Sequence, residues 1–219
     1  MSPIKKKIRD ALLAADFEKL AQMALDDRKV FSILISFTYD KEETLCWRAI
    51  EATGRAAAAA AEEDPSIVRT IVQRLLWSLR DESGGIAWSA PEMLGEIVIN
   101  CPAICADIPP IIFSFHEEEV FLRGVLWAIG RIINSGKVDA ENVDGIFDVV
   151  FRALSHGDPT VRGLALYAAR GSIGKSAKIN NKIKSMANDK GLYRIYLDHK
   201  LVEMTVGDEA RKVVECRSA

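Results

Sequence analysis

The chain has 219 residues, of which 49% are hydrophobic and 27% are charged, proportions that are ordinary for a globular protein and large enough for a core without metal or disulfide support. Its net charge is −2, and residues 31–170 carry 12 Lys and Arg against 20 Asp and Glu. A duplex-binding surface needs an excess of cations, so we expect no duplex nucleic acid partner. The cysteines are four in number and irregularly spaced, which indicates reduced thiols, and no apolar run reaches membrane-spanning length. The N-terminus also lacks the hydrophobic region of a secretory leader, so we expect a cytoplasmic protein that does not bind membranes.

Helices are expected along most of the chain. Residues 1–27 are predicted to form N-terminal capping helices. Asp64-Pro65 and Asp158-Pro159 mark two later helix starts, because aspartate caps free amides and proline at the first helical position leaves no amide unpaired. Apolar residues recur every three or four positions between residues 67 and 79, as in an amphipathic helix. Residues 194–206 contain two β-prone runs, which predict a short hairpin near the end of the chain.

Four similar blocks repeat along the middle of the chain. Each opens with an apolar residue, has a small or aliphatic residue four and seven positions later, and in three blocks a glycine nine positions later. The blocks begin at Leu45, Ile86, Phe121 and Val161, spaced by 41, 35 and 40 residues. This spacing is typical of two-helix solenoid repeats, which bury their cores by stacking on neighbours. The sequence therefore predicts a single domain, 1–219, that is an all-α, α-α superhelix over residues 28–190 with a C-terminal cap or short β-hairpin over residues 191–219.

The fourth block carries a family resemblance. Asp158-Pro-Thr-Val-Arg162, followed by Ala165 and Ala168-Ala169, resembles the second helix of a HEAT repeat. The chain is also similar to a group of bacterial HEAT proteins of no known activity, related to phycobilisome-lyase-type repeats. This resemblance implies a right-handed, armadillo-type solenoid. It also implies a protein-binding scaffold that is not an enzyme and holds no cofactor, because HEAT arrays are mostly of that kind.

Positions two, six and ten of each block share one face of the inner helix, because side chains four residues apart lie on the same side of a helix. This stripe mixes aromatic rings with both signs of charge, residue types that dominate binding hot spots. The alternative is ordinary packing, with the tryptophans in the core and Glu51 and Arg55 as a surface ion pair. The candidate groove residues are Trp47, Glu51, Arg55, Trp88, Glu92, Glu96, Arg123, Trp127, Arg131 and Tyr167.

The second block departs from the others because it contains Trp88 and Pro91 and directly follows Gly84 and Gly85. Two structures are consistent with this segment. In the first, the helix begins near residue 86 and Pro91 kinks it. In the second, Ser89 caps the helix in a capping box, Pro91 lies in the first turn, and the preceding loop exposes Trp88. Either structure would disturb the middle of the predicted groove.

Three short sequence motifs resemble nucleotide- or metal-binding motifs but lack the neighbouring elements or ligands that such sites need. Residues 169–176 fit a loose phosphate-loop pattern, but a helix rather than a strand is expected before them. His116-Glu117 resembles one of the His-Glu pairs of deoxyhypusine hydroxylase, an iron enzyme that needs four such pairs. Cys101 and Cys105 with one remote histidine fall short of a tetrahedral metal site. The sequence therefore predicts no metal.

The favoured function is a non-catalytic scaffold that holds a protein or peptide partner on its concave inner-helix face. Trp88 and Trp127 would be the anchors, with charged neighbours on the stripe fixing the orientation. The alternative is an accessory or lyase-like protein for a small molecule such as a tetrapyrrole. A minor alternative is a DNA glycosylase, because the DNA-alkylation-repeat enzymes resemble this chain in fold class. The acidic Glu51, Glu92 and Glu96 differ from their cationic groove.

Overall fold

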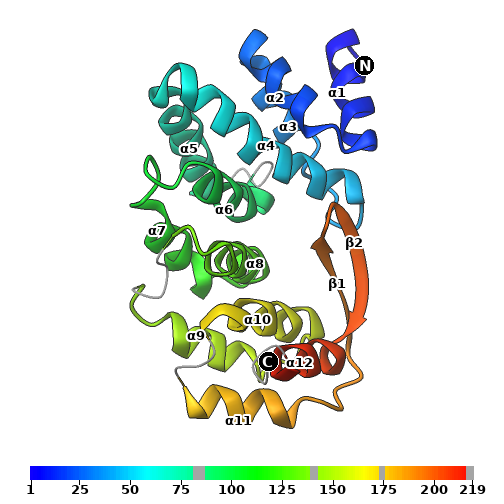
Figure 1. Ribbon diagram of the computed structural model, residues 1–219, viewed down its shortest axis with the longest axis vertical. Coiled ribbons are helices and arrows are strands. Elements are labelled where there is room, and N and C mark those ends of the chain that lie inside the picture. The colour runs from blue at the N-terminus through cyan, green and yellow to red at the C-terminus, as the bar shows by residue number, and fades with distance from the viewer. Residues whose placement is uncertain (81–86, 139–142, 173–175, 216–219) are drawn as a thin grey trace.

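A computed structural model describes residues 1–80, 87–138, 143–172 and 176–215, shown as a ribbon in Figure 1. Residues 83–85, the opening residue Ile86 of the second block, the Gly174-Lys175 pair of the phosphate-loop pattern and Cys216 lie outside the described residues. Within the described parts, no helix is long and apolar enough to cross a membrane.

The described chain is mostly helical and ends in one hairpin followed by a helix. The elements are α1 (Pro3–Ala14), α2 (Phe17–Asp26), α3 (Lys29–Ile35), α4 (Thr44–Glu63), α5 (Pro65–Leu79), the 3-10 turn η1 (Ala87–Ser89), α6 (Ala90–Asn100), α7 (Ile108–Ser114), the 3-10 turn η2 (Phe115–Glu117), α8 (Glu119–Ser135), α9 (Ile146–Ala153), α10 (Pro159–Ser172), α11 (Ala177–Ser185), β1 (Leu192–Leu197), β2 (Lys200–Thr205) and α12 (Val206–Glu215).

The helices stack as a solenoid along the long axis of the molecule (Figure 1). The inner helices α4, α6, α8 and α10 pack on one another in that order, and α5, α7 and α9 pack beside them as outer helices. One continuous hydrophobic cluster runs through the stack, from Ile8 in α1 to Val213 in α12. The predicted all-α superhelix with a short C-terminal hairpin is confirmed.

Both predicted Asp-Pro helix starts are confirmed. Asp64 caps α5 by accepting a hydrogen bond from the Ser66 amide at 2.9 Å, and Asp158 accepts one from the Thr160 amide at 2.9 Å. In each case proline occupies the first turn, where a missing amide costs no hydrogen bond. These caps fix where an outer helix and an inner helix begin.

The glycines nine positions into the blocks let the inner helices approach closely. A Cβ atom added at Gly54 of α4 would lie 2.5 Å from the Glu96 carbonyl oxygen of α6. A Cβ added at Gly95 of α6 would lie 2.8 Å from the Ala128 Cβ of α8. Real Cβ atoms do not approach other atoms so closely, so the repeated glycine belongs to the contact between neighbouring repeats.

The predicted hairpin is present, and its position is the main feature that the sequence did not show. β1 and β2 pair antiparallel, with Leu197 opposite Lys200, and the two-residue turn of Asp198 and His199 has positive φ angles of 47° and 65°. Two positive φ angles are typical of a type I′ turn. The hairpin extends along the stack from α10 and α12 to α4, beside the inner helices (Figure 1). It therefore joins the last repeat to the first.

Candidate functional site

The tip of the hairpin is held against α4 by polar contacts. The carbonyl oxygen of His199 accepts a hydrogen bond from Arg48 Nε at 3.0 Å. Glu51 Oε2 accepts a hydrogen bond from the Tyr196 hydroxyl at 2.7 Å and lies 2.8 Å from His199 Nδ1. The Phe17 ring of α2 packs against the His199 ring with centroids 4.9 Å apart. Glu51, which the sequence assigned to the groove stripe, is therefore a partner of the hairpin.

Glu51 is buried but keeps its charge well compensated. Burial raises its pKa, whereas hydrogen bonds with His199, Tyr196 and Arg55 lower it, and together they hold the pKa of Glu51 below its ordinary value. Arg55 Nη2 lies 2.7 Å from Glu51 Oε1, so the predicted pair is present. The Glu51 carboxylate of this pair is buried, whereas the carboxylate of an ordinary surface pair is solvated.

Two further buried carboxylates join neighbouring elements. Arg131 Nε of α8 donates to Glu96 Oε1 of α6 at 2.7 Å. Burial raises the pKa of Glu96 even though Arg131 opposes that shift. Arg170 of α10 binds Glu209 of α12 through two hydrogen bonds of 2.6 and 2.7 Å. These arginines are engaged within the protein, and each crosses from one layer of the stack to the next.

The aromatic residues of the stripe divide into buried and accessible rings. Trp127 is 1% exposed and Tyr167 is also buried, so both belong to the packed interior. Trp127 lies against Trp47, with ring centroids 5.1 Å apart, and Trp47 stacks on Tyr196 of the hairpin at 5.8 Å. Trp88, by contrast, is 49% exposed. Of the two predicted anchors, Trp88 lies at the surface and Trp127 does not.

The start of α6 explains the exposure of Trp88. The α-helix begins at Ala90, after η1, with Ser89 at the N-cap and Pro91 in the first turn, as in the second structure predicted for this segment. The capping-box hydrogen bonds do not form. The Ser89 hydroxyl donates instead to the Thr38 carbonyl oxygen at 2.8 Å, which ties the segment before α4 to α6.

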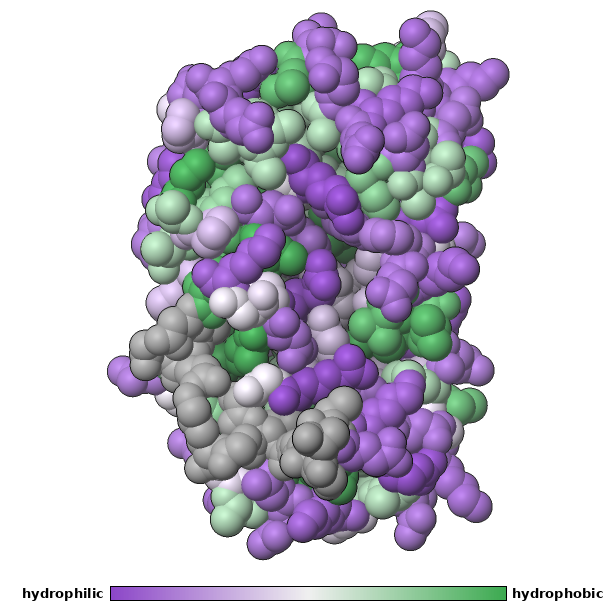
Figure 2. Space-filling view, in the orientation of Figure 1, coloured by the Kyte–Doolittle hydropathy of each residue, from purple (hydrophilic) through white to green (hydrophobic). Residues whose placement is uncertain are grey.

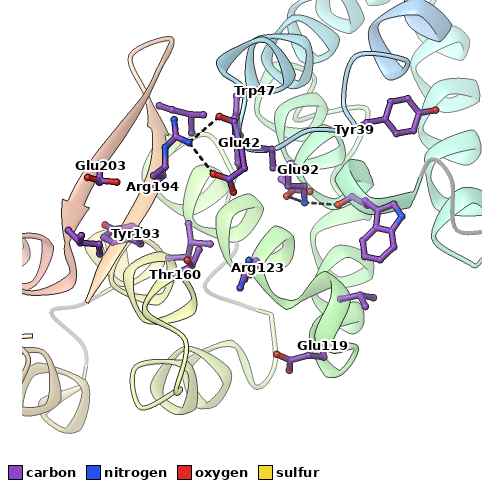
Figure 3. A pocket seen from close by; sticks show the side chains of 16 residues that line it. Tyr39, Glu42, Trp47, Glu92, Glu119, Arg123, Thr160, Tyr193, Arg194 and Glu203 are labelled. Carbon is purple, nitrogen blue, oxygen red and sulfur yellow. Dashed lines mark hydrogen bonds and ion pairs between the residues drawn. The ribbon is translucent and has the colours of Figure 1, made fainter. Parts of the chain in front are cut away.

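A pocket of about 670 Å³ lies between the hairpin and the inner helices. Figure 3 shows Tyr193, Arg194 and Glu203 of the hairpin on one side and Tyr39, Glu92 and Arg123 on the other. The remaining lining residues are Lys41, Glu42, Trp47, Trp88, Glu119, Val120, Thr160, Leu164, Leu192 and Leu201. Apolar and charged groups are mixed, and the volume is in the range of small-ligand pockets.

The face of the molecule drawn in Figure 2 is more uniformly hydrophilic than the lining of this pocket. The face shown in Figure 2 is largely hydrophilic, with a group of hydrophobic residues over β1. Leu192 in β1 is among the exposed large hydrophobic residues, and it also lines the pocket. Leu192 is thus an exposed apolar residue at the pocket, on the strand face that it shares with Arg194.

Glu92 and Lys41 occupy the middle of the pocket wall. Lys41 Nζ lies 2.5 Å from Glu92 Oε1 and 2.6 Å from the Trp88 carbonyl oxygen (Figure 3). Arg194 Nη1 of β1 lies 3.0 Å from Glu42 Oε2, and Arg123 Nε lies 2.8 Å from Asp158 Oδ2. Each cation in the wall therefore already has a carboxylate partner.

Four of the ten predicted stripe residues meet at this pocket: Trp47, Trp88, Glu92 and Arg123. The other six, which do not line it, are Glu51, Arg55, Glu96, Trp127, Arg131 and Tyr167. Repeat periodicity did not reveal the pocket residues Tyr39, Lys41 and Glu42, which precede the first block, or those of the hairpin. The β-prone run predicted the strands, but no local signal indicated where they would dock.

The metal and thiol motifs remain without a site. Among the residues that the structure describes, no group of three or more His, Cys, Asp or Glu side chains is placed to hold a metal ion. Burial raises the pKa of Cys101 and of Cys105 to about 11, so neither is a thiolate at neutral pH. His116 Nδ1 lies 2.8 Å from the Phe113 carbonyl oxygen, a local contact within its own turn.

Together these features define a class of protein: an α-solenoid of stacked helix pairs, bridged along its inner helices by a C-terminal β-hairpin, with a pocket beside the bridge. No family model matches the chain. A protein of Archaeoglobus fulgidus described as uncharacterized is 33% identical over 101 residues, which are 46% of this chain and 52% of that protein, so the match spans about half the length of each. The crystal structure of an archaeal HEAT-like repeats protein from Thermococcus onnurineus NA1 is similar with a TM-score of 0.35 and 16% identity, covering 98% of this chain and 97% of that one.

Proposed function

We propose that the protein is a non-catalytic, cytoplasmic binding scaffold that holds a segment of a partner protein at the pocket on its concave inner-helix face. The observation that carries this proposal is the pocket between the hairpin and α6 and α8, in which aromatic, aliphatic and charged side chains converge. Aromatic and arginine side chains in such places dominate binding energy. The buried free thiols of Cys46, Cys101 and Cys105 fit a reducing compartment. The relation to phycobilisome-lyase-type repeats stays a prediction.

Two accessible aromatic residues at the pocket are the proposed anchors. Tyr39 is 60% exposed and Trp88 is 49% exposed, so a partner can cover both rings. Tyr39 replaces Trp127 in this role, because the ring of Trp127 is buried and cannot be reached without unpacking the helix stack. A partner that covers both rings would bury apolar area next to the charged Glu92 and Arg123.

The test compares three forms of the tagged protein in purifications from its native cell extract. The Tyr39→Ala/Trp88→Ala variant removes the anchors, and Trp77→Ala is the matched control, since Trp77 is 68% exposed on α5 and does not line the pocket. We expect mass spectrometry to find a partner with the wild type and the control. The double variant should lose it, because anchor residues typically contribute about 2 kcal/mol or more each. A partner retained equally by all three forms would contradict the proposal.

A small-molecule accessory role is the second candidate, supported by the pocket volume of about 670 Å³. Trp47 and Trp88 line that pocket, so a bound metabolite or tetrapyrrole should change the intrinsic tryptophan fluorescence. Saturable quenching by such a compound, abolished in the Tyr39→Ala/Trp88→Ala variant, would favour this candidate. Nothing in the pocket favours a DNA glycosylase, since Glu42, Glu119 and Glu203 add negative charge where a duplex would need cations.

A further inference from the structure

Glu92 combines burial, a charge and an unused hydrogen-bonding atom in the wall of the pocket. Its side chain is 1% exposed, and Lys41 Nζ binds Oε1 at 2.5 Å. Oε2 is buried and has no hydrogen-bond partner among the described residues. A buried carboxylate oxygen without a partner costs free energy, so such an atom in a binding pocket indicates a ligand that donates to it.

The neighbouring helix leaves room for this carboxylate. A Cβ atom added at Gly124 of α8 would lie 2.7 Å from Glu92 Oε2 and 2.9 Å from Oε1. Any side chain at this position would therefore push the carboxylate away from α8. Gly124 thus keeps Glu92 where it lines the pocket with one oxygen engaged by Lys41 and the other unpaired.

From this geometry we infer that the pocket receives the ε-ammonium group of a lysine side chain on the bound partner segment, with Glu92 Oε2 as its acceptor. The inference rests on the proposed function and gives the chemistry of the residue that enters the pocket. Lysine fits better than arginine, because arginine binds carboxylates best through both oxygens at once and Lys41 already occupies one of them. The ammonium group needs only a single acceptor.

The other walls of the pocket suit a lysine side chain as well. The accessible rings of Tyr39 and Trp88 can pack against its aliphatic stem, and aromatic faces also attract cations. Four carboxylates and three cations line the pocket, and two of these cations, Arg123 and Arg194, are paired with Asp158 and Glu42. A positively charged ligand therefore offsets the net negative charge of the pocket lining and adds to no excess of positive charge.

The experiment uses N-acetyl-lysine methylamide as the probe, compared with its norleucine and arginine counterparts by ligand-detected NMR at neutral pH and low salt. We expect the lysine probe to bind at least tenfold more tightly than either. In Glu92→Gln, lysine affinity should fall at least tenfold, to the level of norleucine. The matched control is Glu62→Gln, which removes one exposed carboxylate of α4 outside the pocket and should leave the affinity unchanged.

For a second variant, Lys41→Met, we expect a gain of affinity for the arginine probe rather than a loss. Lys41→Met frees Glu92 Oε1, so the arginine probe should then bind at least as tightly as the lysine probe. Equal binding of lysine and norleucine to the wild type would overturn the inference, as would an unchanged affinity in folded Glu92→Gln. If Glu92→Gln does not fold, the Lys41→Met variant provides the test. An affinity for the arginine probe that does not rise in Lys41→Met would then refute Glu92 as the acceptor of a lysine side chain.

Two outcomes separate this inference from the proposed function. If a cellular partner depends on Tyr39 and Trp88 but is retained by Glu92→Gln, the scaffold proposal stands and the lysine assignment is wrong. If the lysine probe binds through Glu92 but no partner depends on the two anchors, the scaffold proposal fails and the cation site remains. Tighter binding of 1,5-diaminopentane than of the lysine probe would identify a free amine as the ligand and overturn the assignment to a protein side chain.

Discussion

Replacing Gly54 by alanine should destabilise the protein, although the same change usually stabilises an exposed helix. Alanine favours the helical conformation by about 1 kcal/mol relative to glycine. At Gly54, however, the new Cβ would lie 2.5 Å from the Glu96 carbonyl oxygen and 2.7 Å from its carbonyl carbon. These are backbone atoms of α6, so α4 and α6 must move apart. Overpacking of this kind costs about 1–3 kcal/mol, and against a backbone we take the upper end.

The expected net loss for Gly54→Ala is therefore about 2 kcal/mol, which corresponds to a fall in Tm of about 4–8 °C for a chain of this size. Urea unfolding followed by circular dichroism measures the first quantity and a thermal scan the second. Gly157→Ala is the matched control, because nothing lies within 4 Å of a Cβ added there and its φ is not positive. If Gly54→Ala is as stable as the control or more stable, close approach of the inner helices is not the reason for the repeated glycine.

Three more predictions concern the buried polar groups. Folding lowers the pKa of Glu51 from its ordinary value of 4.5, so the ionised carboxylate stabilises the fold above pH 4.5, and this stabilisation is lost as the pH falls through the folded-state pKa. The difference in the free energy of unfolding between wild type and Glu51→Gln, measured in urea, should therefore shrink at acidic pH. Arg170→Met leaves the Glu209 carboxylate buried without its partner and should cost about 3–5 kcal/mol in the same assay, a cost that Arg170→Met/Glu209→Leu should largely remove. In a Cys216→Ser background, a thiol reagent at pH 8 should react only after unfolding, because burial raises the pKa of each described thiol to about 11 or 12; these are Cys46, Cys101 and Cys105.

Features of the fold that depend on neighbouring residues were predictable from the sequence. The Asp-Pro pairs start helices through contacts within one turn, and the Asp198-His199 turn closes a hairpin between adjacent β-prone runs. The block spacing predicted the stacking of the inner helices because each repeat must cover the next. The repeated glycines at positions 54 and 95 were visible as a pattern, and the structure supplies their reason.

The candidate site was only partly predictable because it depends on contacts between distant segments. The helical stripe grouped Trp47, Glu92 and Arg123, and these three residues line the pocket. Periodicity cannot show that Tyr196, about 145 residues later in the chain, packs on that face and bonds to Glu51. It also cannot distinguish an accessible ring from one such as Trp127, which the neighbouring helices cover.

The hairpin also limits how this protein can change its length. Open repeat arrays gain and lose units readily, because each unit touches only its neighbours. Here six-residue strands, about 20 Å long, reach from α10 to Glu51 on α4. One more helix layer would add about 10 Å to the stack and lift the tip away from its contacts with Arg48 and Glu51. The strand length therefore limits the number of repeats that the hairpin can span, and a chain with a duplicated repeat would need a longer hairpin.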